Sequence, residues 1–278
     1  MTPGVYYDLP FEEYQAIHAI NCSKLVAFSK TPAHALVEKP DTNGMRLGRA
    51  VHAALLEPER FAKEWVTMPE DLTRRGKKWK DFQEENKTAQ IISLSEMASI
   101  VGIIKSLNSG YYETARKLIA LCDASEVTLV WMDRKHGCLC KARLDLISKS
   151  LGAIVDVKSS TTADPKQWAR TAINAGGKPH FQPAWYIDGA KEIVEHPVNM
   201  FAWVLCEIKE PFGISVIQAC PVPENMPDIV YLGELEIEPI LEKYLACERS
   251  EKFPGRPDRV EFAEFPQWYW KQSLKEDY

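Results

Sequence analysis

Three consecutive stretches in the middle of the chain constrain the fold more than any other feature. Residues 126–133, 138–147 and 153–160 are rich in β-branched, aromatic and leucine side chains, and only short turns separate them. Connections this short join neighbouring antiparallel strands, whereas parallel strands need a long crossover. The pattern therefore predicts three sequential antiparallel strands at the centre of the fold.

The third stretch, Ala-Ile-Val-Asp-Val-Lys-Ser-Ser, contains Asp156 and Lys158. Side chains two apart in a strand share a face, about 6–7 Å from each other. Asp156 and Lys158 are therefore expected to project together, with Val155 and Val157 packed behind them. A carboxylate that holds a divalent cation, next to a lysine that orients or deprotonates water, is a minimal site for phosphodiester hydrolysis. The alternative is a surface ion pair worth ~0–1 kcal/mol.

A second acid, Asp145, lies near the end of the preceding stretch, across a short turn from Asp156. If the two strands pair in register, the two carboxylates converge. Carboxylates aimed at one point repel each other, and burying them without a cation is costly. Oxygen ligands of this kind suit magnesium or manganese. The two strands therefore predict a divalent-cation site.

Residues 44–58 have the periodicity of an amphipathic helix. Gly48 and His52 lie one turn apart on a face next to its apolar stripe. A glycine inside a helix costs about 1 kcal/mol relative to alanine, so we expect another element to approach closely at Gly48. His52 then points at that element. It is either a metal ligand or a histidine satisfied by hydrogen bonds in the interior, and the residues alone leave both readings open.

The rest of the chain reads as helices around further strands, with no repeat and no linker between domains. We therefore expect one domain over residues 1–278, made of a mainly helical part (1–121), a sheet-centred part (122–222) and a C-terminal helix and tail (223–278). The aromatic cluster Trp268, Tyr269 and Trp270 is expected to pack on the body or on another subunit. Helices are predicted within 5–40, 93–121, 165–175, 180–194 and 223–251, and strands at 198–207 and 213–220.

The formal net charge of −5 counts mildly against a nucleic-acid-binding protein, although local clustering of basic residues matters more. One dense basic run, residues 74–80, has Trp79 inside it. It is either a solvated, mobile segment or an arm that grips phosphates while Trp79 stacks on a base.

Cysteine usage and hydropathy bound the location of the protein. The seven cysteines include no C-x-x-C pair, which argues against a structural zinc or an iron–sulfur cluster and favours a reducing cytoplasm. No apolar run is long enough to span a bilayer, and the first residues do not form a signal peptide.

Taken in order, the motifs are Gly48-x-x-x-His52, Glu126, Asp145, Asp156-x-Lys158 and Gln182-x-x-x-Tyr186. This order resembles the PD-(D/E)XK nuclease superfamily. It resembles more closely the RecE-type exonucleases (exodeoxyribonuclease VIII) of phage and prophage recombination systems. The matching residues are Leu47-Gly48, His52, Leu56-Glu57-Pro58, Asp156-Val157-Lys158-Ser159, Gln182 and Tyr186. Leu144 is a departure, since the superfamily often has proline before its first aspartate.

The resemblance implies an α/β fold of the restriction-endonuclease type, in which helices flank a mixed central sheet and helical additions lie at both ends. It implies that Asp145, Asp156 and the Val157 carbonyl bind the cation, with His52 contributing or binding a second ion. Lys158 would orient or deprotonate the attacking water, and Glu126 would lie near the metal. Gln182 and Tyr186 would line the cleft and hold the DNA strand.

The resemblance also implies a magnesium-dependent 5′→3′ exonuclease that acts on double-stranded DNA ends in the cytoplasm of a bacterial or phage-infected cell. Manganese would substitute, and two ions would bind with substrate. The product, a 3′ single strand, would pass to a single-strand annealing protein. Relatives form rings, so a trimeric or tetrameric homo-oligomer is expected. Candidate DNA contacts are Arg46, Arg49, Arg74, Arg75, Lys77, Lys78, Trp79, Arg143, Ser159, Arg170 and Lys178.

Three alternatives stay open at this stage. The chain could be an endonuclease or another DNA-repair nuclease of the superfamily, among which an iron–sulfur nuclease of the CRISPR-associated type is disfavoured by the missing cysteine cluster. It could be a DNA-binding or assembly module without catalysis. It could also be a globular protein in which these residues form ordinary ion pairs.

Overall fold

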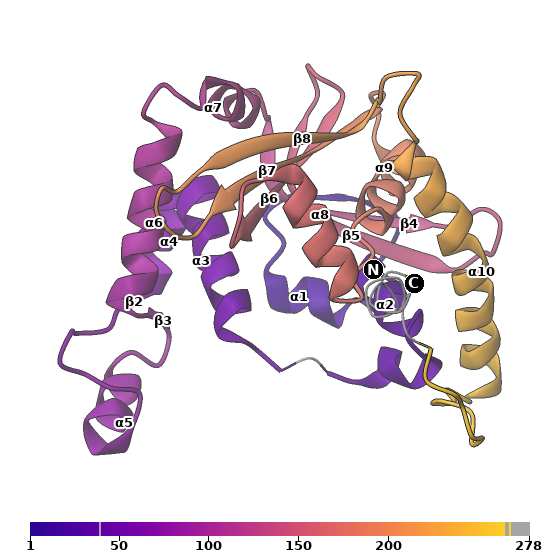
Figure 1. Ribbon diagram of the computed structural model, residues 1–278, viewed down its shortest axis with the longest axis horizontal. Helices are drawn as coiled ribbons and strands as arrows, with labels where there is room; N and C mark the ends of the chain where they lie inside the picture. Colours follow the sequence, from indigo (N-terminus) through magenta and orange to yellow (C-terminus); the bar gives the residue numbers. More distant parts are fainter. Residues whose placement is uncertain (39, 265–266, 268–278) are drawn as a thin grey trace, which may run out of the picture.

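A six-stranded mixed sheet forms the centre of the computed structural model, which describes residues 1–38, 40–264 and 267 (Figure 1). The strand order is β1-β4-β5-β6-β7-β8; β6 and β7 are parallel, and the other neighbours are antiparallel. The three sequential antiparallel strands predicted in the middle of the chain are therefore present. The bounds are β1 Gly4–Tyr6, β4 Ala124–Met132, β5 Leu139–Ser148, β6 Ala153–Ser160, β7 Met200–Glu207 and β8 Ile214–Cys220.

Helices cover both faces of the sheet, so β6 is buried on both sides. On one face, a core cluster is built from the sheet with α2 (Cys22–Phe28), α9 (Phe181–Ile193) and α10 (Ile229–Ser250). Ile154 of β6 belongs to this cluster. Val155 and Val157 belong to a second cluster on the other face. That second cluster includes α3 (Asn43–Leu56), α6 (Leu94–Leu107) and α7 (Glu113–Ala120).

The expected alternation along β6 is thus observed. Val155 and Val157 pack toward α3, whereas Asp156 and Lys158 point with Ile154 toward the face that α9 covers. The shorter helices complete the chain between these layers. They are α1 (Phe11–Ala16), the 3-10 turn Pro32–Leu36, α4 (Pro58–Glu64) and α8 (Pro165–Asn174).

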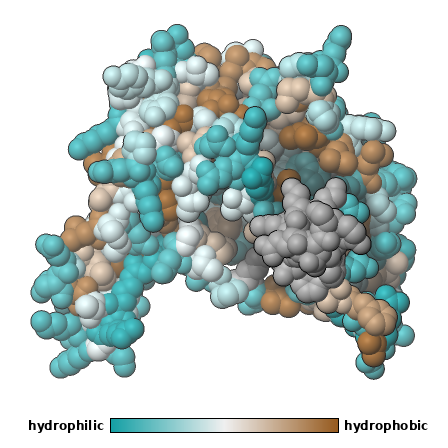
Figure 2. Space-filling view, viewed as in Figure 1, coloured by the Kyte–Doolittle hydropathy of each residue, from teal (hydrophilic) through white to brown (hydrophobic). Residues whose placement is uncertain are grey.

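An arm formed by residues 65–92 projects from the body at the lower left of Figure 1. Its base is a parallel pair, β2 (Trp65–Thr67) with β3 (Gln90–Ile92), and its tip is α5 (Gly76–Glu85). Its surface is largely hydrophilic (Figure 2). The sequence pattern gave no secondary structure here, because strands of three residues carry too little periodicity and α5 buries no side chain.

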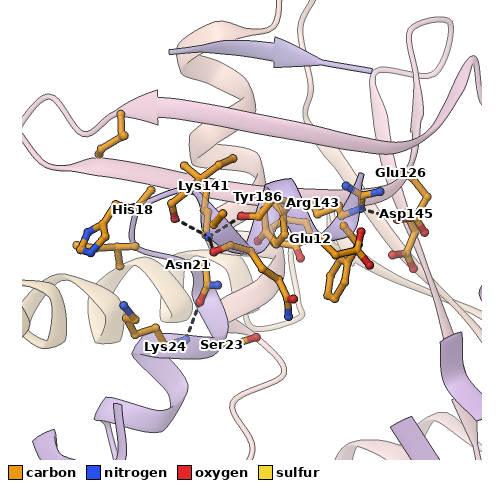
Figure 3. A pocket seen from close by; sticks show the side chains of 18 of the residues that line it. Glu12, His18, Asn21, Ser23, Lys24, Glu126, Lys141, Arg143, Asp145 and Tyr186 are labelled. Atoms are coloured by element: carbon orange, nitrogen blue, oxygen red, sulfur yellow. Dashed lines mark hydrogen bonds and ion pairs between the residues drawn. The ribbon is translucent and has the colours of Figure 1, made fainter. Parts of the chain in front are cut away.

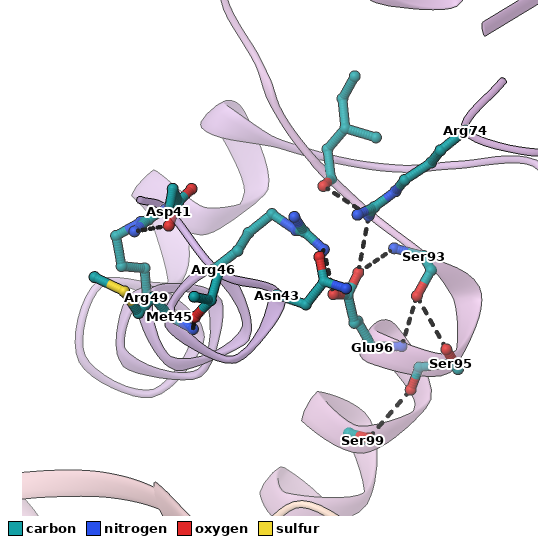
Figure 4. Close-up of polar contacts among 12 residues, drawn as sticks. Asp41, Asn43, Met45, Arg46, Arg49, Arg74, Ser93, Ser95, Glu96 and Ser99 are labelled. Atoms are coloured by element: carbon teal, nitrogen blue, oxygen red, sulfur yellow. Dashed lines mark hydrogen bonds and ion pairs between the residues drawn. The ribbon is translucent and has the colours of Figure 1, made fainter. Parts of the chain in front are cut away.

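Glu96 fastens the arm to the body (Figure 4). Its carboxylate accepts hydrogen bonds from Arg46 of α3 at 2.8 Å and from Arg74 of the arm at 3.2 Å. It also accepts from the Ser93 amide at 2.7 Å, which completes a capping box at the start of α6. One carboxylate therefore joins α3, α6 and the arm.

None of the helices in the described residues has the length and apolar character needed to cross a membrane. None of the seven cysteines, all of which lie in the described residues, forms a disulfide bond. The expected packing of Trp268, Tyr269 and Trp270 falls outside the described residues.

Gly233 marks the closest approach of α10 to α9, and it supplies a test of this packing. A Cβ there would lie 2.5 Å from the His180 carbonyl oxygen and 2.7 Å from the Ala184 Cβ. Because a backbone atom cannot move aside cheaply, we expect Gly233→Ala to lower the free energy of unfolding by about 1–3 kcal/mol, despite the better helix propensity of alanine.

Urea denaturation measures this change, and Gly44→Ala is the matched control. Gly44 is also helical, but a Cβ there would meet nothing closer than the Thr42 hydroxyl at 3.9 Å. The control should be neutral or more stable by up to about 1 kcal/mol. Equal behaviour of the two variants would contradict the close packing of α9 against α10.

Candidate active site

The site lies where β5 and β6 stop pairing. Their register runs from Ser148↔Ala153 to Leu146↔Val155 and ends there. Beyond that point the Val157 amide donates to Asp145 Oδ2 at 2.8 Å. A carboxylate side chain thus replaces the next strand as the partner of a backbone amide. This gap in the ladder brings Asp145 against β6 and leaves its other oxygen for a further ligand.

Glu126 faces the same gap from β4. The pairing of β4 with β5 passes from Ser125↔Leu146 to Val127↔Leu144 and omits Glu126 and Asp145. Glu126 has a φ of 53°, which is uncommon for a residue with a side chain and marks a constrained backbone. Ligand atoms of His52, Glu126 and Asp145 all lie within 4.8 Å of one another.

His52 reaches the gap from α3. A Cβ at Gly48 would lie 3.3 Å from the Ser159 hydroxyl, so the close approach expected at this glycine is that of β6. His52 Nε2 donates to the Val157 carbonyl at 2.5 Å, since a carbonyl can only accept. In the neutral imidazole the lone pair is therefore on Nδ1, which lies 3.4 Å from Asp145 Oδ2. The Val157 carbonyl fixes the tautomer that a metal-binding histidine needs.

Asp156 and Lys158 form a second group beside the first. Asp156 is 2% exposed, and Lys158 Nζ lies 2.7 Å from its Oδ2. Gln182 of α9 donates to its Oδ1, and Trp203 Nε1 in turn donates to the Gln182 carbonyl oxygen at 3.4 Å. Burial by itself would lower the pKa of Lys158, but the charges of Asp156 and Asp145 outweigh burial and raise that pKa. Lys158 is therefore a protonated ammonium group that its ion pair with Asp156 keeps in place.

The electrostatics of this region favour a bound cation. Burial raises the pKa of Asp145, and the negative charge of Asp156 raises it further against the opposing effect of His52 and Lys158. Carboxylates in such a setting need positive charge to stay ionised. Two carboxylates with one imidazole nitrogen match the donor preferences of Mg²⁺ and Mn²⁺, with the nitrogen suiting the softer Mn²⁺.

The predicted ligand set is brought together only in part. His52 and Asp145 lie together, and Glu126 joins them. Asp156 is instead engaged with Lys158 and Gln182. The Val157 carbonyl accepts the hydrogen bond from His52. The structure thus shows two adjoining groups, one suited to a cation and one that holds an ammonium.

Both carboxylates of the first group open onto a cavity of about 1570 Å³ (Figure 3). His52, Glu126, Asp145 and Tyr186 line it, together with side chains of α1, α3 and α10. Tyr186 lies one turn beyond Gln182 on α9, as the sequence spacing predicted. Burial raises the pKa of Tyr186 well above its usual value, so its phenol remains a hydrogen-bond donor.

Five of the eleven predicted DNA contacts form ion pairs within the protein. Arg46 and Arg74 bind Glu96. Arg49 binds Asp41 through two hydrogen bonds of 2.9 and 2.7 Å. Arg143 and Lys178 are likewise paired, with Glu126 at 2.6 Å and Glu236 at 2.7 Å. Of the members without an ion pair, Trp79 and Ser159 are half-buried, whereas Arg75, Lys77, Lys78 and Arg170 are exposed. Of the predicted set, Arg49 and Arg143 line the cavity.

The sequence analysis predicted only helices within residues 5–40 and did not identify the role of the segment before α2. Phe11 and Tyr14 of α1 line the cavity. Lys141 of β5 is buried and donates to the carbonyls of Tyr14, Gln15 and Ile17 at 2.8, 3.2 and 2.8 Å (Figure 3). The available signal was a lysine placed between Cys140 and Ala142, two small side chains of a strand in which charged residues recur at every second position.

The pH dependence of stability tests this buried ammonium. Burial, with a smaller effect of Lys24, lowers the pKa of Lys141 from 10.5 to about 8. Between these values the unfolded chain binds the proton more fully than the folded one, so Lys141 makes stability rise with pH, by at most about 1.4 kcal/mol per pH unit. The neighbouring Tyr14, whose pKa is raised mainly by burial to about 12, titrates above this window.

We therefore expect the difference in free energy of unfolding between wild type and Lys141→Met to increase in favour of wild type from pH 8 to pH 10.5. Urea denaturation at several pH values measures it, and the comparison cancels groups common to both proteins. A difference independent of pH would contradict the burial of a charged Lys141.

The fold and site together define a nuclease-like domain, and comparisons with known proteins agree. The sequence model of a family described as "PDDEXK-like domain of unknown function (DUF3799)" matches residues 21–265. The chain belongs to this family. No curated protein sequence matches it.

Solved structures support the same fold. A crystal structure described as a "Putative exonuclease" from Eubacterium rectale is similar over 95% of this chain and 98% of its own, with a TM-score of 0.60 and 13% sequence identity. A second crystal structure, of the protein SSO0001, covers 78% of this chain and 85% of its own with a TM-score of 0.27 and 16% identity, too low to support an argument. The predicted restriction-endonuclease-like α/β fold is confirmed by the family match and the first of these structures.

Proposed function

We propose that the chain is a metal-dependent exonuclease that degrades double-stranded DNA from its 5′ ends. The observation that carries this proposal is the convergence of His52, Glu126 and Asp145 on one point of a large cavity. The Asp156–Lys158 ion pair lies on the neighbouring strand β6, and both charges affect the pKa of Asp145. Membership in a PDDEXK-like family and the fold shared with a structure described as an exonuclease support the same reading.

His52, Glu126 and Asp145 would hold the cation, with Asp156 bordering it. A divalent cation at such a position polarises a phosphoryl oxygen and lowers the pKa of bound water. The ammonium of Lys158, held by Asp156, orients the attacking water and offsets the charge that develops on the phosphate. Gln182 keeps Asp156 in place, and Tyr186 offers its hydroxyl to the substrate cavity.

The finer parts of the proposal rest on the resemblance to RecE-type exonucleases. They are the use of Mg²⁺ with Mn²⁺ as a substitute, two ions with substrate, the 5′→3′ direction and the transfer of a 3′ strand to an annealing protein. They also include a trimeric or tetrameric ring and a cytoplasmic location. A ring would place the acidic surface outside and basic side chains toward its channel, which fits a DNA enzyme with a net charge of −5.

Two substitutions test the assignment of the site. Asp145→Asn removes a charged ligand, and Lys158→Met removes the ammonium while keeping most of the side-chain volume. Each should lower Mg²⁺-dependent degradation of linear duplex DNA by at least about 100-fold, the usual scale for losing one electrostatic contact to the transition state. End-labelled linear duplex, with Mg²⁺, with Mn²⁺ and with EDTA, provides the assay.

Asp258→Asn and Lys105→Met change equivalent but exposed residues outside the arm and should leave the rate unaltered. Circular dichroism and urea denaturation check that each variant is folded. Wild-type rates in either site variant would overturn the proposed catalytic roles.

The same assay separates the alternatives. An endonuclease would cut closed circular duplex as fast as linear duplex, whereas the proposed exonuclease requires an end. A binding module without catalysis would bind DNA and release no nucleotides with any cation.

The exposed lysines of the arm make a separate prediction. Lys77 and Lys78 lie on α5 and are exposed, unlike Arg74, which binds Glu96. If they contact phosphates, Lys77→Ser with Lys78→Ser should reduce the slope of log affinity against log salt concentration by about 0.9 per lost contact.

Fluorescence anisotropy with duplex DNA in EDTA, at several salt concentrations, measures the slope. Lys105→Ser with Lys149→Ser provides a control of the same charge on exposed positions outside the arm. An identical slope in the arm variant and wild type would assign the arm to solvated surface.

A further inference from the structure

Phe11 has an unusual setting for a large apolar side chain. It opens α1, a six-residue helix that buries none of its side chains. It is 39% exposed, and it lines the same cavity as His52, Glu126 and Asp145. A phenylalanine in this position adds little to the core, while its ring borders the space that a substrate would enter.

The ring is part of a larger aromatic and cationic surface. Phe11 stacks on Tyr14, with ring centroids 6.1 Å apart and planes inclined by 27°. The guanidinium carbon of Arg143 lies 5.9 Å from each of the two centroids. Arg143 Nε also lies 2.6 Å from Glu126 Oε2. A single arginine therefore connects the aromatic pair to the carboxylates that would hold the cation.

The segment that carries these rings is fixed to the sheet. Lys141 donates to three of its carbonyls, and Arg143 donates to the Leu9 carbonyl at 2.7 Å. Lys141 Nζ also lies 4.6 Å from the centroid of the Tyr14 ring. Ile20 then bridges to Cys140 of β5. A surface held by this many contacts is preorganised, so little conformational entropy is lost when a ligand stacks on it.

We propose that Phe11, backed by Tyr14 and flanked by Arg143, stacks on the face of a nucleobase at a DNA end. The adjoining backbone phosphate would then lie at His52, Glu126 and Asp145. This inference rests on the proposed nuclease function and adds to it the part of the substrate that is bound.

An aromatic surface of this kind suits the exposed face of a terminal nucleobase. Bases stack on aromatic side chains regardless of sequence, because each base has a π face. In the interior of a duplex, neighbouring pairs cover both faces of every base. A free face exists at a terminal pair or on an unpaired terminal nucleotide. The surface at Phe11 therefore recognises ends, and it does so without sequence preference.

A thermodynamic cycle between the protein and the DNA tests the proposal. The affinity of wild type and Phe11→Ala is measured in EDTA, where no hydrolysis occurs, for a short duplex labelled at an interior position. The same duplex is then prepared with an abasic terminal nucleotide on either the 5′ or the 3′ strand end. For each strand end, fluorescence anisotropy gives four affinities: those of wild type and of Phe11→Ala for the intact and for the abasic duplex.

Stacking of Phe11 on the terminal base predicts that Phe11→Ala weakens binding to the intact duplex by about 5- to 150-fold, the loss of one base–aromatic contact. One of the two abasic duplexes lacks the base on which Phe11 stacks. For that duplex, Phe11→Ala should not change the affinity, since the contact is already missing. Phe11→Trp should retain wild-type affinity. Tyr111→Ala removes an aromatic ring that is 90% exposed and lies outside the cavity lining, and it should change nothing.

Urea denaturation checks the fold of Phe11→Ala, and Phe11→Leu, which keeps apolar bulk without a π face, repeats the cycle. The inference would be overturned if Phe11→Ala lowered the affinity for the intact and the abasic duplexes equally, whichever strand end is abasic. Nucleotide release with Mg²⁺ or Mn²⁺ is scored separately. If Phe11 and the terminal base are coupled but no nucleotides are released, the proposed nuclease is refuted and an end-binding site remains. If nucleotides are released but Phe11 and the terminal base are not coupled, only the site at Phe11 is refuted.

Discussion

The end of the β5–β6 ladder is the feature on which the rest of the site depends. As long as two strands pair, their backbone groups satisfy each other and their side chains stand apart. After Leu146↔Val155 the pairing ends, and Asp145 takes over the Val157 amide. This places a carboxylate in the gap between the strands, next to Glu126, whose left-handed backbone turns it toward the same point. Asp156 adds to the resulting repulsion, and His52 on one side and the ammonium of Lys158 on the other oppose it.

That arrangement explains why the sequence predicts the fold well and the site less completely. Short turns and apolar strands determine local pairing, so β4, β5 and β6 follow from the pattern of residues alone. The spacing of Asp156 and Lys158 fixes their common face for the same reason. The break in pairing at Asp145 has no such signature, since it depends on which backbone groups lose their partners in three dimensions. The sequence grouped Asp156 both with Lys158 and with Asp145. The structure shows the ion pair with Lys158, adds a hydrogen bond from Gln182, and brings His52 and Glu126 to Asp145.

The partners of the basic residues were the feature that the sequence predicted least well. A cluster of Arg and Lys in the sequence indicates a phosphate-binding surface only if its charges are unpaired in space. Arg46 and Arg74, far apart in sequence, instead share Glu96 and hold the arm against α3 and α6. Arg143 is shared in another way, because it binds a candidate metal ligand, a backbone carbonyl and two aromatic rings. Ion pairs between residues far apart in the sequence cannot be predicted from local charge. The lysines of α5, Lys77 and Lys78, are by contrast exposed, as their place in a basic run indicated.

The N-terminal segment shows how one buried charge organises a cavity wall. A six-residue helix is too short to be stable by itself, and α1 has neither a buried side chain nor a side-chain N-cap. Near its C-terminal end, the Tyr14 and Ile17 carbonyls accept backbone hydrogen bonds from the Ile17 and Ala19 amides, and each keeps a lone pair for a second donor. Lys141 donates to both of them and to the Gln15 carbonyl, and the favourable interaction of a cation with a helix C-terminus opposes the cost of burying its charge. Lys141, Arg143 and Asp145 are spaced two apart on β5. The same strand therefore contacts the α1 segment, forms an ion pair with Glu126 and contributes a candidate metal ligand. The position of Phe11 relative to the carboxylates is therefore set by the geometry of one strand, and α1 remains ordered beside a cavity that it does not help to fill.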